Sequence, residues 1–83
     1  MKVRIKYFAS VRETIGHASE DVETQATTLA ALRAELVARG GAYADCLASG
    51  RALRMAQNQV MTDEASALVD GAEIAFFPPV TGG

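Results

Sequence analysis

The chain has 83 residues and a formal net charge of −2, with 49% hydrophobic and 22% charged residues. A chain this short forms one domain and buries only about 60–65% of the surface of its unfolded state, which leaves little room for a deep active-site cavity. The small net charge provides no general attraction to nucleic acid or to an anionic membrane. We therefore expect a single domain that binds neither.

The single cysteine, Cys46, excludes an internal disulfide and fits a reducing compartment. No apolar run approaches the ~18 residues of a membrane span, and no signal-like segment opens the chain. These features predict a soluble, cytoplasmic protein. No metal-ligand or catalytic spacing surrounds Cys46, so we expect no metal site and interpret Cys46 as a small, half-buried apolar residue.

Basic residues are concentrated at the start of the chain. Residues 1–12 contain Lys2, Arg4, Lys6 and Arg12 and no acid, whereas all ten acids lie from Glu13 onward. We favour a solvated strand face as the explanation. The alternative is a docking surface for an acidic partner.

The first half of the chain predicts strand, short helix, strand and helix. Residues 2–8 alternate, which predicts a half-buried strand: Val3, Ile5 and Tyr7 lie on one side, and Lys2, Arg4, Lys6 and Phe8 on the other. Residues 9–16 predict one or two helical turns ended by Gly16, and residues 18–24 a polar strand. His17 falls in a predicted turn, where we expect a surface residue rather than a catalyst.

The main helix is expected over residues 28–39. Its apolar stripe has helical spacing: Leu29, Leu32, Leu36 and Val37. Thr27 or Thr28 should provide the N-cap. Glu35 and Arg39 have the spacing of an ion pair, and Gly40 stands where a left-handed C-terminal cap belongs.

The second half predicts short strands. Residues 52–57 form one, and residues 58–63 either turn or continue in extended form. Asp70-Gly71 is a turn signal. The last strand covers Glu73 to Phe77 and ends at two prolines, which cannot donate ladder hydrogen bonds.

This order predicts an α+β fold in which one main helix covers one face of a mixed sheet. A β-grasp, ubiquitin-like arrangement satisfies it, with the first and last strands side by side at the sheet's centre. In the last strand Ile74 and Phe76 share one parity and should face the core. Phe77 then points outward beside Phe8 and forms an exposed apolar patch. The alternative is a one-residue slip in register, which would bury these rings.

Residues 1–77 should form the domain and residues 78–83 an extended, flexible tail. Six extended residues reach about 20 Å, and Gly82-Gly83 has no side chains, so it can enter a narrow slot. A terminal carboxylate on Gly83 would need activation, for instance as an acyl-adenylate made with ATP. The alternative is a frayed terminus without function.

Three motifs carry a resemblance to a known family. The ending Ala75 to Gly83, AFFPPVTGG, the segment Phe8 to Glu13 and the approach DG-x-EIAFF from Asp70 resemble the small subunit of molybdopterin synthase. The similarity covers essentially all of the chain. Gln57 departs from the family, where a small apolar residue is more familiar, and puts the packing of that strand in doubt.

The resemblance implies a sulfur carrier of the β-grasp fold that has no active site of its own and no permanently bound cofactor. An adenylyltransferase related to ubiquitin-activating enzymes would use ATP to adenylate Gly83, and a sulfur-donating protein would supply the sulfur of a thiocarboxylate. The tail would then enter the large subunit and transfer sulfur to cyclic pyranopterin monophosphate. Two small and two large subunits would form a heterotetramer.

The resemblance also implies the site residues. Gly83 is the reactive terminus and Gly82 gives it slim access. The partner-binding residues implied on the domain and along the tail are Phe8, Met61, Phe77, Pro78, Pro79, Val80 and Thr81.

The sequence leaves three other functions to be compared with this one. A sulfur carrier of the thiamine pathway or a protein modifier would share the Gly-Gly end, but its approach usually differs from Phe-Phe-Pro-Pro. A non-catalytic interaction module would not need Gly83. An autonomous enzyme lacks support, because the sequence shows no nucleophile–base pair, metal-ligand cluster or phosphate loop.

Overall fold

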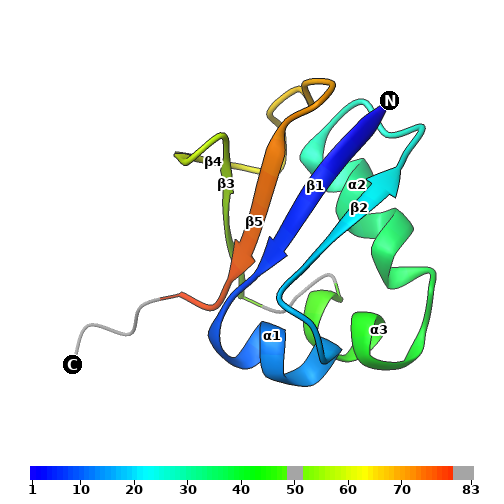
Figure 1. Ribbon diagram of the computed structural model, residues 1–83, viewed down its shortest axis with the longest axis vertical. Coiled ribbons are helices and arrows are strands. Elements are labelled where there is room, and N and C mark those ends of the chain that lie inside the picture. Colours follow the sequence, from blue (N-terminus) through cyan, green and yellow to red (C-terminus); the bar gives the residue numbers. More distant parts are fainter. Residues whose placement is uncertain (49–51, 80–83) are drawn as a thin grey trace.

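The computed structural model describes residues 1–48 and 52–79. Five strands form one sheet in the order β2-β1-β5-β3-β4, with α2 behind the sheet and α1 and α3 at one end (Figure 1). The elements are β1 (Lys2–Tyr7), α1 (Ala9–Ile15), β2 (Ser19–Glu23), α2 (Leu29–Val37), α3 (Gly41–Leu47), β3 (Arg54–Gln57), β4 (Val60–Thr62) and β5 (Glu73–Phe77).

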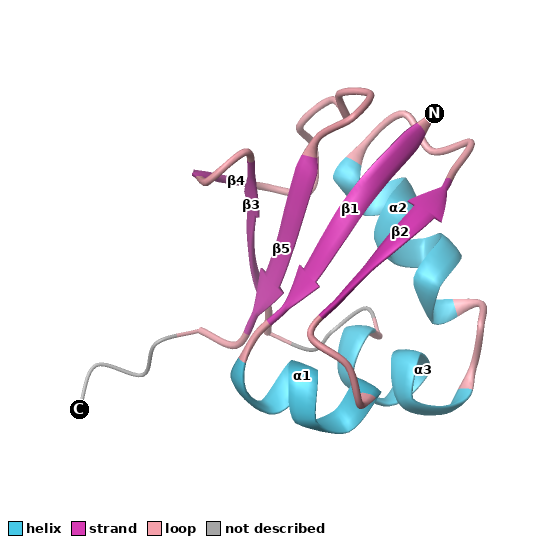
Figure 2. Cartoon of the chain, viewed as in Figure 1, coloured by secondary structure: helices cyan, strands magenta, loops and turns pink. Residues whose placement is uncertain are grey.

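The first and last strands lie side by side, as predicted (Figure 2). β1 and β5 pair in parallel, with Ile5 opposite Ile74 and Tyr7 opposite Phe76, whereas the other three strand pairs are antiparallel. β5 occupies the middle position of the sheet. The mixed sheet and its helices confirm the α+β, β-grasp prediction.

The core lies between the sheet and the helices. Ile5, Ile74 and Phe76 are fully buried, which confirms the predicted side-chain parity of both central strands. α2 contributes a stripe of buried leucines, Leu29, Leu32 and Leu36, as its helical spacing predicted.

Thr28 caps α2, because its side-chain oxygen accepts a hydrogen bond of 3.1 Å from the Ala31 amide. The predicted ion pair between Glu35 and Arg39 is wrong. α2 ends at Val37, so Arg39 is outside the helix and binds Glu20 instead, at 2.9 Å. The Glu35 carboxylate accepts a hydrogen bond from the Thr24 hydroxyl.

The prediction of a single main helix missed α3. Gly40 has a positive φ of 75°, but it precedes α3 and is not a left-handed cap on α2. Within α3 only Leu47 is fully buried, while Tyr43 and Cys46 are half-buried. A helix that begins at a glycine and buries so little has a weak periodic signal.

Residues 58–63 turn and return as β4, which decides between the two predicted courses. Asn58 and Gln59 both have positive φ, 51° and 69°, as in a tight two-residue hairpin turn. Gln57 packs without conflict because its amide holds the loop before β5. Its Nε2 donates to the Ala67 carbonyl and its Oε1 accepts from the Val69 amide, both at 2.9 Å.

A polar cluster around Glu20 joins β1 and β2 to the α2–α3 region. One carboxylate oxygen accepts from the hydroxyls of Tyr7 (2.9 Å) and Tyr43 (2.6 Å) and contacts His17 Nε2 (3.0 Å), while the other binds Arg39. Burial opposes ionisation of Glu20, but these four neighbours overcome it and lower its pKa to about 2. His17 is exposed, as predicted, yet contributes to this cluster.

We expect the Glu20 cluster to make folding stability sensitive to acid. The folded-state pKa lies below the ordinary value of 4.5, so the stabilisation is complete above that value and is lost as pH falls toward 2. Glu20→Gln should lower the free energy of unfolding at pH 7 by about 1–2 kcal/mol. It should also reduce the fall in stability between pH 5 and 2, measured by urea unfolding.

The control is Glu13→Gln, which removes an exposed carboxylate from α1. This variant should keep the wild-type pH profile. If the free energy of unfolding of Glu20→Gln fell with pH in parallel with that of the wild type, the Glu20 cluster would not be the source of the acid sensitivity.

Candidate functional site

The face of the sheet turned away from the helices carries the predicted docking residues. Strand register places its side chains in three rows. The row at the end of β5 contains Phe8, Phe77 and Arg54. The next row contains Lys6, Ala75, Ala56 and Met61, and the third contains Asp21, Arg4 and Glu73.

Phe8 and Phe77 lie together on this face, as predicted. Their rings meet edge to face, with centroids 6.3 Å apart and planes at 88°. Phe8 is 45% exposed, and Phe77 is half-buried. The Phe8 amide donates to the Phe76 carbonyl at 3.2 Å, which fixes the start of α1 against the end of β5. The register therefore exposes a pair of aromatic rings at the point where β5 ends.

Met61 extends this apolar surface to the edge of the sheet. It is 53% exposed and lies opposite Ala56 in the β3–β4 register. We call Phe8, Met61, Ala75 and Phe77 the outer patch. Such a contiguous exposed apolar surface is typical of a protein–protein interaction site.

The charged part of this face is largely neutralised within the domain. Arg4 pairs with Asp21 and Lys6 with Glu73, each at 2.9 Å. The hydrogen bond from Lys6 lowers the pKa of Glu73, and that from Arg4 lowers the pKa of Asp21. The positive charges of Arg4 and Lys6 are thus matched by acids of the same domain. For these two residues the structure agrees with the favoured interpretation, a solvated strand face, and does not require an acidic partner.

The chain leaves the sheet beside the outer patch. Pro78 and Pro79 follow Phe77 directly and are half-buried, and Pro78 lines a pocket with Ser10 and Thr14 of α1. The predicted tail residues Val80, Thr81, Gly82 and Gly83 lie outside the described residues. The boundary between residues 77 and 78 thus remains a prediction.

The described part of the chain was also compared with three other features: a metal site, a reactive cysteine and a membrane-spanning helix. Residues 1–48 and 52–79 contain no group of three or more His, Cys, Asp or Glu side chains that could hold a metal ion. Cys46 is half-buried, as predicted, and its thiol donates to the Ala42 carbonyl at 3.2 Å. None of the described helices is long and apolar enough to cross a membrane.

Sequence reasoning missed part of the outer face. Alternation along β5 does place Ala75 on the outward side with Phe77, because the two share parity. Arg54 and Ala56 could not be assigned to a face, since the short segment RMAQ has no clear alternation. The register with β5 places them.

The strand order and the open sheet face define a ubiquitin-like β-grasp protein. The SAMP1 structure from Haloferax volcanii has the same fold, with a TM-score of 0.79 and 24% identity over 100% of both chains. The structure of a protein–protein complex of subunits 1 and 2 of the molybdopterin-converting factor from Helicobacter pylori contains a similar chain. That chain has a TM-score of 0.69 and 26% identity, again over 100% of both chains.

Sequence comparison narrows the class further. The model of the ThiS family matches residues 5–83. The molybdopterin synthase sulfur carrier subunit of Escherichia coli is 40% identical over 81 residues, which cover 98% of this chain and 99% of that protein. The chain therefore belongs to the ThiS family and, within it, to the family of molybdopterin synthase sulfur carrier subunits.

Two adjacent phenylalanines test the assignment of faces. Phe76→Ala should cost about 3–5 kcal/mol of unfolding free energy, because it opens a cavity in the core. Phe77→Ala should cost about 1 kcal/mol, since it removes mainly the ring contact with Phe8. Urea unfolding followed by circular dichroism measures both. Loss of cooperative folding in Phe77→Ala, with Phe76→Ala stable, would mean that the register is wrong.

Proposed function

We propose that this protein is the sulfur-carrying small subunit of molybdopterin synthase and that the carboxyl group of Gly83 carries the sulfur. The main support is the 40% identity to the Escherichia coli sulfur carrier subunit over almost the whole of both chains. The position of the outer patch beside the base of the tail gives this function a physical basis.

The proposed chemistry takes place at the end of the tail. A carboxylate is a poor acylating group, so an activating enzyme first transfers AMP from ATP to the Gly83 carboxylate and releases pyrophosphate. Sulfide-level sulfur from a sulfur-donating protein then attacks the acyl carbon, the bond from that carbon to AMP breaks, and Gly83 is left with a thiocarboxylate. The thiocarboxylate sulfur is a nucleophile that can replace an oxygen substituent on the pterin precursor, cyclic pyranopterin monophosphate. Water then cleaves the bond between the sulfur and the Gly83 acyl carbon, which leaves the sulfur on the pterin and returns the Gly83 carboxylate.

In this proposal the domain positions the tail and the partner supplies the catalytic groups. The large subunit covers Phe8, Met61 and Phe77, and residues 78–83 reach up to about 20 Å from the end of β5. Gly82 and Gly83 pass through a channel too narrow for side chains. Docking thereby holds the sulfur at high effective concentration beside the acceptor.

Two small and two large subunits form the proposed assembly. The related Helicobacter pylori chain was solved in a complex of two different subunits. An exposed apolar patch on a domain of this size is consistent with such a partner, because burying one aromatic ring contributes roughly 1.5–3 kcal/mol.

The carrier chemistry predicts a defined mass change. Incubation with the activating enzyme of the same organism, ATP and a sulfur source should raise the intact mass by about 16 Da, as one oxygen is replaced by sulfur. Deletion of Gly83 should abolish the change. An unchanged wild-type mass, under conditions that convert an established carrier, would contradict the proposal.

The docking surface predicts a separate binding defect. Phe77→Ala and Met61→Ala should each weaken binding to the large subunit by about tenfold or more, because both remove apolar contact area. Isothermal titration calorimetry measures the affinity, and circular dichroism checks the fold.

Val69→Ala is the matched control. Val69 is also exposed, at 52%, but lies in the loop before β5, at the far end of that strand from Phe77. Equal losses in all three variants, or none in any, would show that the outer patch is not the interface.

A further inference from the structure

We infer that Arg54 is a specificity-determining residue of the docking face, and that it selects a large subunit that places a carboxylate against the end of β3. This inference rests on the proposed function, because it requires the outer patch to be covered by a partner. It adds an electrostatic requirement to a surface so far described by its apolar residues.

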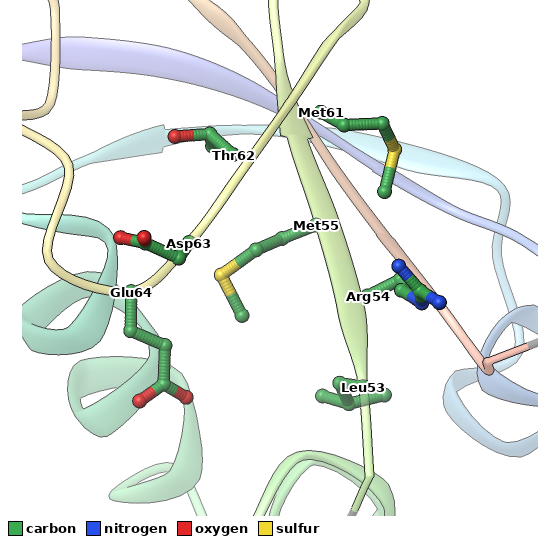
Figure 3. Close-up of a pocket in the computed structure, with 7 residues that line it drawn as sticks. All are labelled: Leu53, Arg54, Met55, Met61, Thr62, Asp63 and Glu64. Atoms are coloured by element: carbon green, nitrogen blue, oxygen red, sulfur yellow. The ribbon is translucent and has the colours of Figure 1, made fainter.

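Arg54 lies within the proposed interface. It is exposed and sits directly opposite Phe77 in the β3–β5 register. Figure 3 shows its guanidinium on the same side of β3 as Met61, whereas Met55 points away to the other side. A partner that covers both Phe77 and Met61 therefore also covers Arg54.

The other cations in the three rows of this face already have partners. Arg4 binds Asp21 and Lys6 binds Glu73. Within residues 1–48 and 52–79, by contrast, Arg54 forms no ion pair. Among the described residues, its positive charge is therefore not paired with an acid and lies beside the apolar part of the face.

The two acids that share a pocket with Arg54 are engaged elsewhere. Asp63 and Glu64 line the same pocket as Arg54, but Figure 3 places them on the side of Met55. Asp63 accepts a hydrogen bond of 2.9 Å from the Ala65 amide, and Glu64 binds Arg33. Neither is placed to neutralise Arg54 when a partner covers it.

A covered guanidinium needs a hydrogen-bonding anion. Desolvating a charge against apolar surface is unfavourable unless the charge is paired, and the planar guanidinium fits a carboxylate through two parallel hydrogen bonds. A large subunit with a carboxylate at this point gains a contact. One with a neutral or basic group there is rejected, so Arg54 discriminates between partners of similar apolar shape.

Calorimetric titration with the large subunit of the same organism tests the inference. Arg54→Glu should weaken binding by about 30-fold or more, and Arg54→Leu by about tenfold, because the partner carboxylate loses its counter-charge. Arg54→Lys should retain part of the affinity. The affinity of Arg54→Leu should also depend less on salt than that of the wild type.

Lys2→Leu is the matched control, since it removes one exposed positive charge from the opposite end of the same face. It should bind within about twofold of the wild type, as expected for a charge remote from the contact. A scan that replaces each acid of the large subunit by lysine should find a position that restores binding of Arg54→Glu.

The outcomes separate the two proposals. The role of Arg54 alone would be overturned if Arg54→Glu bound the large subunit as tightly as the wild type does, or if Lys2→Leu lost as much affinity as Arg54→Glu. It would also be overturned if no acid-to-lysine substitution in the large subunit restored binding of Arg54→Glu. A wild-type protein that does not bind the large subunit, with its fold intact, would overturn the proposed function and this inference together.

Discussion

The parallel pairing of β1 with β5 determines the rest of the structure. The register that sets Ile5 opposite Ile74 and Tyr7 opposite Phe76 turns these side chains into the core. Because strand side chains alternate, the same register turns Phe8 and Phe77 outward. This one pairing thus sets both the core between the sheet and α2 and the proposed docking face on the other side of the sheet. A slip of one residue would exchange the two sets of side chains.

The docking face combines two different surfaces. Its far end carries Arg4 and Lys6, whose charges are matched by acids of the same domain. Its near end carries the outer patch, beside the residues that lead into the tail. In the proposed complex, the partner would meet apolar surface where the tail begins and would have to match the charge of Arg54. In the proposed complex, binding of the outer patch would also orient the tail, because the patch lies beside the end of β5 from which the tail begins.

Features that depend on neighbours in the sequence were predicted well. Alternation placed Phe8 and Phe77 outward, and the Thr28 cap was found from its side chain and position. The missed features depend on distant contacts. α3 buries little, so its pattern is weak, and Arg39 turns to Glu20, 19 residues away, because α2 ends before it. Met61 was assigned through family resemblance alone, and the structure places it on the outer face.

By itself the sequence determined the side-chain parity of the two central strands, the main helix and the Gly-Gly ending with its family, because each depends on local spacing or on a contiguous motif. Only the tertiary structure decided that β3 places Arg54 beside Phe77, that Gln57 anchors a loop and that four side chains surround Glu20. These arrangements join residues from separate elements. Their geometry is set by sheet register and by the packing of α2 and α3, which no local pattern encodes.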